Sequence, residues 1–170
     1  MPELLECRGA ELYELGKDLA DAGASLHVEV RGWSMYPLIR DRDEIRVSPT
    51  TIDDINVGDV AFFRSGNRLL AHRVVGHLTD GGRTSLRVRG DRFRQEDPPF
   101  GQEELVGRVV TVFRNRRGGK RVIYLDRGFS RFVGFFITHS RAAHYCYRWG
   151  AHSMQRFENL VARVLSFSGD

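Results

Sequence analysis

Residues 60–75 have the sequence VAFFRSGNRLLAHRVV, in which two runs rich in apolar, β-branched and aromatic residues flank the turn residues Ser65-Gly66-Asn67. Runs of this length, bounded by glycine and asparagine, are typical of short β-strands separated by a turn. The pattern recurs through the middle of the chain. It predicts seven strands: Leu26 to Val30, Glu44 to Val47, Val60 to Arg64, Leu69 to Val75, Ser85 to Arg89, Val106 to Phe113 and Arg121 to Leu125. A mainly β fold is therefore expected.

Helical periodicity is confined to the two ends of the chain. Residues 3 to about 22 place leucines near one face, and Gly23 follows as a stop signal. From about residue 138 the apolar residues again follow steps of three or four, and arginines flank that face. We therefore expect three parts: an N-terminal amphipathic helix in 1–25, a β domain in 26–126, and an aromatic and arginine-rich helical segment in 127–170.

The 170 residues carry 26 basic and 22 acidic side chains, but these charges are unevenly distributed. Residues 1–60 have a net charge of −7, residues 61–126 of +7 and residues 127–170 of +4. An arginine-flanked amphipathic helix suits an anionic membrane surface, so a peripheral membrane contact through 127–170 is one interpretation. The other is that this helix packs on the β domain or on a partner subunit. Nucleic acid is not expected, because the acidic N-terminal part offers only one helix.

The compartment and cofactor expectations come from what the sequence lacks. No stretch approaches the 18 to 20 apolar residues of a membrane span, and the N-terminus has no basic region followed by an apolar core. We expect a cytoplasmic protein, with a peripheral position at the inner membrane face as the alternative. Cys7 and Cys146 have no metal-ligand spacing, so neither a metal nor another cofactor is expected.

Two polar residues stand where a nucleophile and a base could meet. Ser34 lies between Gly32, which permits a turn, and Pro37, which stops strand pairing, so its hydroxyl is presented on a bend. His72 interrupts an apolar strand pattern. Each residue alone has an ordinary interpretation, Ser34 as a backbone cap and His72 as a core side chain. Asp91 and Asp97 follow as carboxylates beside strand ends, where they could simply terminate turns.

Taken together, five blocks resemble the signal peptidase I and LexA-type self-cleaving repressor superfamily of serine peptidases. In chain order they are Gly32-Trp33-Ser34-Met35-Tyr36-Pro37, Val57-Gly58-Asp59-Val60, His72-Arg73-Val74-Val75, Gly90-Asp91 and Val106-Gly107-Arg108-Val109. The resemblance covers about half of the chain. It implies a signal-peptidase-like β-barrel of short strands, with an N-terminal helix and a C-terminal amphipathic helix.

The resemblance also assigns the catalytic residues. Bacterial signal peptidases and the repressors have a lysine where this chain has His72, so the sequence is more similar to the archaeal and endoplasmic-reticulum branch. In that branch an aspartate downstream supports the histidine, which Asp97 matches best and Asp91 second. The sequence departs from the family at Gly32, where relatives often carry a hydroxyl, and at Arg92 and Phe93, which replace small polar residues.

The chemistry of such a set is peptide hydrolysis. A serine hydroxyl needs a base within hydrogen-bond reach, and histidine, which ordinarily titrates near pH 6.5, can take that proton and return it to the leaving amine. Asp97 would orient the ring, and backbone N–H groups around Ser34 would face the oxyanion. The leading interpretation is a serine endopeptidase acting on a protein or peptide. The alternatives are a non-catalytic or peripheral membrane-binding module on the same scaffold and a repressor-type self-cleaving regulator.

Overall fold

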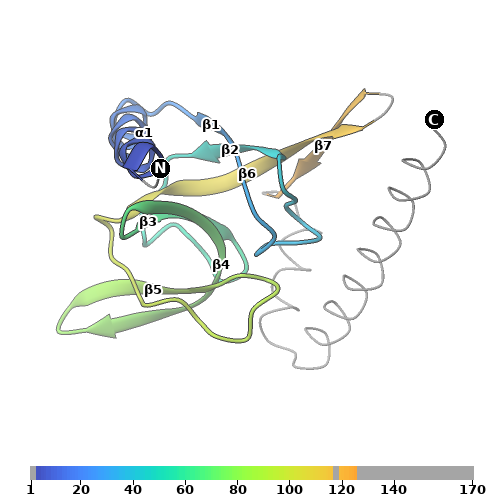
Figure 1. Cartoon of the computed structure of the whole chain (residues 1–170). Helices are drawn as coiled ribbons and strands as arrows, with labels where there is room; N and C mark the ends of the chain where they lie inside the picture. The colour runs from blue at the N-terminus through green and yellow to red at the C-terminus, as the bar shows by residue number, and fades with distance from the viewer. Residues whose placement is uncertain (1–2, 117–118, 126–170) are drawn as a thin grey trace, which may run out of the picture.

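One helix and seven strands make up the part of the chain described by the structure, a computed structural model that covers residues 3–116 and 119–125 (Figure 1). The mainly β expectation is confirmed, because all seven strands pair antiparallel in a single sheet. The elements are α1 (Glu3–Asp21), β1 (Leu26–Glu29), β2 (Glu44–Ser48), β3 (Val60–Ser65), β4 (Arg68–Asp80), β5 (Arg83–Arg89), β6 (Leu105–Arg116) and β7 (Gly119–Tyr124).

Strand β6 is the centre of the sheet, whose order is β1-β2-β6-β3-β4-β5. One edge of β6 pairs with β2, and the opposite edge pairs with β3 near its start and with β7 near its end. Figure 1 shows this long strand crossing the molecule, with β3 and β7 at its two ends. Register shifts interrupt the β2–β6, β3–β6 and β4–β5 ladders, and such bulges bend the strands that carry them.

The sheet is not closed into the barrel that the resemblance implied. Closure needs a ladder between the end strands β1 and β5, and the described residues form none. The outer edge of β5 is already occupied, because Leu86 bridges Phe100 and the Asp97 N–H donates to Val88 O at 3.0 Å. At the other end β1 is only four residues long, which leaves little backbone to pair.

Two apolar clusters lie on the bent sheet. The first is covered by α1, which packs against β1, β4 and β6 (Figure 1), and its buried members include Tyr13, Leu26, Met35, Ile39, Ile45 and Val112. The second is formed by β3, β4, β5 and the segment that leads to Phe100, whose ring stacks on Phe63 at 4.1 Å between centroids. The second cluster lies beneath the segment that carries His72.

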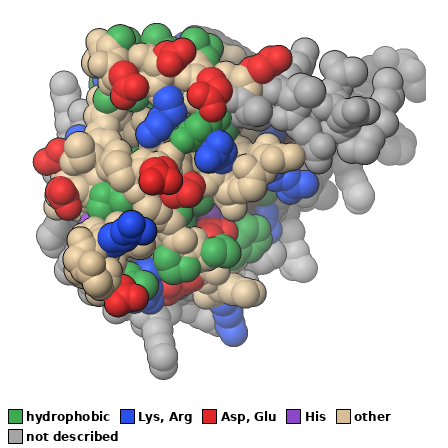
Figure 2. All heavy atoms as spheres, turned by 90° about the vertical axis from the view of Figure 1, so that its left-hand side faces the viewer, with side chains coloured by type: hydrophobic (Ala, Val, Ile, Leu, Met, Phe, Trp, Pro, Cys, Tyr) green, Lys and Arg blue, Asp and Glu red, His purple; other side chains and the backbone are tan. Residues whose placement is uncertain are grey.

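The surface mixes charges of both signs. Figure 2 shows acidic and basic side chains interspersed with small apolar areas over one face. Several exposed cations are paired, among them Arg31 with Glu29 and Arg87 with Glu96. Such exposed pairs contribute little to stability individually.

No helix within residues 3–116 and 119–125 combines the length and apolar character needed to cross a bilayer. The expected C-terminal helix, the expected segment 127–170 and the membrane contact assigned to it lie outside the described residues.

Candidate active site

Ser34 lies in a loop that leaves β1 and returns to β2. Two backbone hydrogen bonds close the loop at its base, from Val30 N to Asp43 O and from Arg42 N to Val30 O, both 2.9 Å long. Gly32 has a φ of +103°, a conformation that favours glycine, and its N–H donates to Asp41 Oδ1 at 2.8 Å. The predicted glycine turn before Ser34 is therefore confirmed.

A buried ion pair between Arg114 and Asp43 anchors this loop to the sheet. Arg114, on β6, donates from Nη2 to Asp43 Oδ2 at 2.7 Å and to the carbonyl of Leu38 at 2.9 Å. Met35 and Tyr36 next to Ser34 are buried as well. The loop is thus anchored by side chains and by main chain, which is the kind of support that holds a reacting group in place. Sequence reasoning missed the Arg114–Asp43 pair.

His72 lies on β4 with its ring held by a carboxylate. Its Nδ1 is 2.6 Å from Asp97 Oδ2, and the whole residue is only 4% exposed. The ring contacts two aromatic rings edge-on, Phe63 at 6.2 Å and Phe93 at 6.3 Å between centroids. With Nδ1 directed to the carboxylate, Nε2 is the nitrogen left to face a substrate or a nucleophile.

The segment that carries Asp97 is fastened to β5 at three points. Beyond the Asp97 N–H bond to Val88 O and the Leu86–Phe100 bridge, Arg87 donates to both carboxylate oxygens of Glu96 at 2.8 Å. This hydrogen bonding by Arg87 lowers the pKa of Glu96 below its ordinary value. The edge of β5 thereby sets the position of the carboxylate on His72.

Gly90 is the point at which the Ser34 loop and His72 meet. A β-carbon on Gly90 would lie 3.1 Å from the carbonyl oxygen of Ser34 and 3.2 Å from Nε2 of His72. Both atoms therefore lie within 3.2 Å of the same point. The N–H of Arg92 donates to the same Ser34 carbonyl at 2.9 Å, which ties the Gly90 turn to the loop.

Within the described part of the chain, the Ser34 hydroxyl makes no hydrogen bond, and the N–H groups of Ser34 and Met35 have no protein acceptor. These are the donors expected to face an oxyanion. Hydrogen bonds between nucleophile and base are often long in unliganded enzymes and shorten when substrate binds. The structure thus brings Ser34, His72 and Asp97 into one region, with the His72–Asp97 contact already formed.

Asp91 has a different partner. Its two carboxylate oxygens accept from Nε and Nη2 of Arg73 at 2.7 and 2.6 Å, and both side chains are at most 3% exposed. Arg73 also donates to Gly58 O at 2.8 Å. Because Arg73 follows His72 on a strand, its side chain points to the opposite face of the sheet. Asp97, rather than Asp91, is the aspartate hydrogen-bonded to His72.

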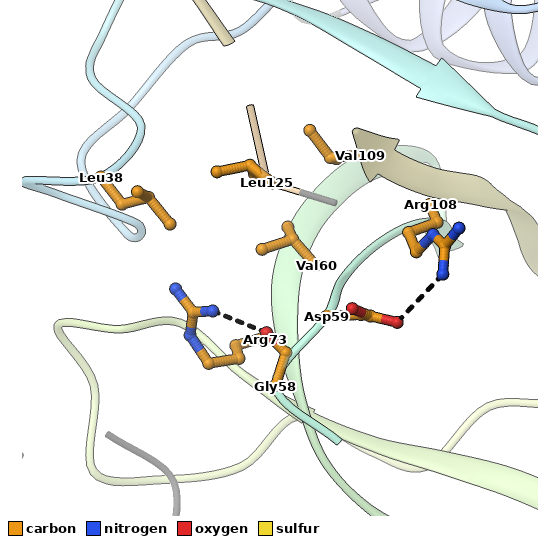
Figure 3. A pocket seen from close by; sticks show the side chains of 8 residues that line it. All are labelled: Leu38, Gly58, Asp59, Val60, Arg73, Arg108, Val109 and Leu125. Atoms are coloured by element: carbon orange, nitrogen blue, oxygen red, sulfur yellow. Dashed lines mark hydrogen bonds and ion pairs between the residues drawn. The ribbon is translucent and has the colours of Figure 1, made fainter. Parts of the chain in front are cut away.

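A small pocket lies on that opposite face (Figure 3). Its polar wall consists of Asp59 and two arginines, and Asp59 accepts from Arg108 at 3.3 Å, as Figure 3 shows. The lining residues are Leu38, Gly58, Asp59, Val60, Arg73, Arg108, Val109 and Leu125. Among the described residues, no three or more His, Cys, Asp or Glu side chains are grouped so that they could hold a metal ion. This pocket is distinct from the Ser34–His72 region.

Comparison of the chain with models of known protein families finds no match, and comparison with curated proteins finds no similar sequence. The resemblance to serine peptidases therefore depends on the five sequence blocks alone.

Proposed function

We propose that this chain is a serine endopeptidase of the signal-peptidase-like type, with Ser34 as nucleophile, His72 as general base and Asp97 as the residue that orients the base. The observation that carries the proposal is the position of His72: Nδ1 is held by Asp97 at 2.6 Å while Nε2 faces the Gly90 turn beside Ser34. A nucleophile, its base and an orienting third group in this order are typical of hydrolytic triads.

In the proposed reaction Ser34 Oγ attacks the carbonyl carbon of a peptide bond while His72 Nε2 takes the hydroxyl proton. The C–N bond then breaks, His72 returns the proton to the leaving amine, and an ester on Ser34 remains. Water hydrolyses that ester with His72 again as base. The N–H groups of Ser34 and Met35 are the proposed donors to the oxyanion, and such donors typically contribute about 3 to 4 kcal/mol.

The positions of the two lysines favour histidine over lysine as the base. Lys17 Nζ lies within hydrogen-bond distance of the carbonyls of Gln102 and Leu105, and Lys120 Nζ is 2.8 Å from Glu44. These are the only lysines in the sequence. Each is held by groups other than the Ser34 loop, so neither is in the position of a lysine base.

An open strand edge beside His72 suits an extended peptide. Residues 68–72 of β4 pair with β3 on one side, whereas the ladder with β5 starts only at Arg73. The other edge of 68–72 is unpaired within the described residues and leads directly to His72. A peptide that added to this edge as a strand would be held by main-chain hydrogen bonds. We therefore propose a protein or peptide segment in extended conformation as the substrate.

The test is covalent labelling of the serine. Folded wild-type protein is incubated with an alkyl fluorophosphonate and its intact mass is measured, alongside Ser34→Ala, His72→Ala and the control Ser65→Ala, a serine at the far end of β3. We expect one adduct on wild type and on Ser65→Ala, none on Ser34→Ala, and a rate at least about 10³-fold lower for His72→Ala. An adduct on Ser34→Ala, or no adduct on folded wild type, would contradict the proposal.

A further inference from the structure

Phe93 occupies an unusual place for a large apolar side chain. It ends the turn that begins at Gly90, with its N–H donating to Gly90 O at 2.9 Å. One side of its ring meets the edge of His72, yet the residue is 51% exposed. Phe63, which contacts the same imidazole, is buried at 1%. Phe93 is thus an aromatic surface held beside the proposed base and open to solvent.

The strand register explains why a bound peptide would meet this ring. In the β4–β5 ladder Arg89 is opposite Arg73, so Gly90 comes next to His72. There the turn diverts the chain, and the edge of β4 at 68–72 continues without a partner among the described residues. A peptide added to that edge would continue the line of β5 and would approach the Gly90–Phe93 turn at the level of His72.

We propose that Phe93 determines specificity by forming an apolar wall for one side chain of an extended peptide substrate, close to the bond that is cut. The inference depends on the proposed endopeptidase function and adds the chemical class of the residue selected. Packing an apolar side chain on an exposed aromatic ring removes apolar surface from water, which is favourable. A small or charged side chain would not provide this stabilisation. Loss of one such contact typically changes kcat/KM by about 10- to 100-fold.

The residues on either side of Phe93 offer a competing selection. Arg92 and Arg94 form no ion pair with any of the described carboxylates. Their charges would favour an acidic residue at the same place. The two mechanisms predict opposite substrate profiles, because an aromatic wall selects leucine-like residues and a pair of arginines selects aspartate and glutamate.

The experiment is cleavage of a peptide library of mixed natural sequences, with the cut sites mapped by mass spectrometry. Wild type, Phe93→Ala, Phe93→Leu and the control Leu78→Ala are compared, the last being an exposed apolar residue on the β4–β5 hairpin. We expect wild type, Phe93→Leu and Leu78→Ala to favour an apolar residue within two positions of the cut bond. In Phe93→Ala the ratio of apolar to alanine cut sites should fall about 10-fold or more.

Three results would overturn the inference and leave the proposed function in place. An unchanged cleavage profile in an active Phe93→Ala protein would refute the role of Phe93 and leave the peptidase function in place. A wild-type preference for acidic residues near the cut bond would do the same. The wild-type profile decides the point even if a variant fails to fold, because the absence of an apolar preference near the cut also refutes the wall. Failure of folded wild type to react with the fluorophosphonate would instead remove the proposed function and this inference together.

Discussion

Replacement of Gly90 by alanine tests the contact on which the candidate site depends. The added methyl group would lie 2.8 Å from Phe93 Cδ2, 3.1 Å from the Ser34 carbonyl oxygen and 3.2 Å from His72 Nε2. Gly90 does not have a positive φ, so the backbone itself accepts alanine. Phe93 is half exposed and can move outward, whereas Ser34 O is main chain and His72 is held by Asp97. The added methyl group is therefore expected to push the Ser34 loop and His72 apart.

The expected loss of stability is modest and the expected loss of activity is large. Overpacking costs about 1 to 3 kcal/mol, and the lower entropy of the unfolded chain offsets about 0.4 to 1 kcal/mol of that. For a chain of this size 1 kcal/mol shifts Tm by about 2 to 4 °C, so the net change lowers Tm by at most roughly 10 °C. The contacts at 3.1 and 3.2 Å require the Ser34 loop and His72 to shift by a few tenths of an ångström. Because a misplacement of about 1 Å can lower a rate on the order of 10²-fold, we expect a loss of up to that size. Gly90→Ala should thus remain folded but react slowly.

The assay pairs thermal unfolding with the rate of fluorophosphonate labelling, and Gly76→Ala is the matched control. Gly76 lies in the same sheet, lacks a positive φ, and a β-carbon there would make only an ordinary contact, 3.5 Å from Arg87 Nη1. We expect Gly76→Ala to label at the wild-type rate. Labelling of Gly90→Ala at the wild-type rate would show that Gly90 does not set the Ser34–His72 geometry, and the reasoning would fail.

Three further predictions concern carboxylates. Asp97→Asn should lower the labelling rate by about 10³- to 10⁴-fold with little change in Tm. Asp91→Ala should instead lower the unfolding free energy by about 3 to 5 kcal/mol in urea titration, because it removes the carboxylate that pairs with the buried Arg73. A large loss of stability in Asp97→Asn together with a large loss of labelling in Asp91→Ala would show that the two roles are exchanged. The hydrogen bonds from Arg87 lower the folded-state pKa of Glu96, so this pair stabilises the fold above the ordinary value of 4.5 and the contribution disappears as pH falls through the folded-state pKa. The Tm advantage of wild type over Glu96→Gln should therefore be present at about pH 6 and diminish as the pH falls below 4.5; a difference that stays constant with pH would contradict it.

Some features of this protein follow from local sequence alone. Alternation and turn residues predicted the strands around Ser65-Gly66-Asn67, because a short strand and a tight turn depend mainly on neighbouring residues. Gly32 indicated a bend before Ser34 for the same reason, and its positive φ bears this out. The strand prediction ended too early where the side chains become exposed. We predicted a strand to Val75, but β4 continues to Asp80, and its last four residues are exposed and show no apolar alternation. There the ladder with β5, rather than a buried face, maintains the strand.

Other features were decided only by tertiary structure. The resemblance ranked Asp97 before Asp91 as the partner of His72, but residue pattern alone left both as carboxylates beside strand ends. The tertiary structure separates them, because Asp97 is hydrogen-bonded to His72 and Arg73 donates to both oxygens of Asp91. Likewise, no local pattern links Asp43 to Arg114, 71 residues away. Nor did any pattern show that residues 97–100 cover the edge of β5 on which a barrel would have closed. Each outcome depends on which distant segment of the chain lies beside a strand edge or a buried charge in the folded state. An unpaired strand edge or an unpaired buried charge costs free energy, and its partner can come from any part of the chain.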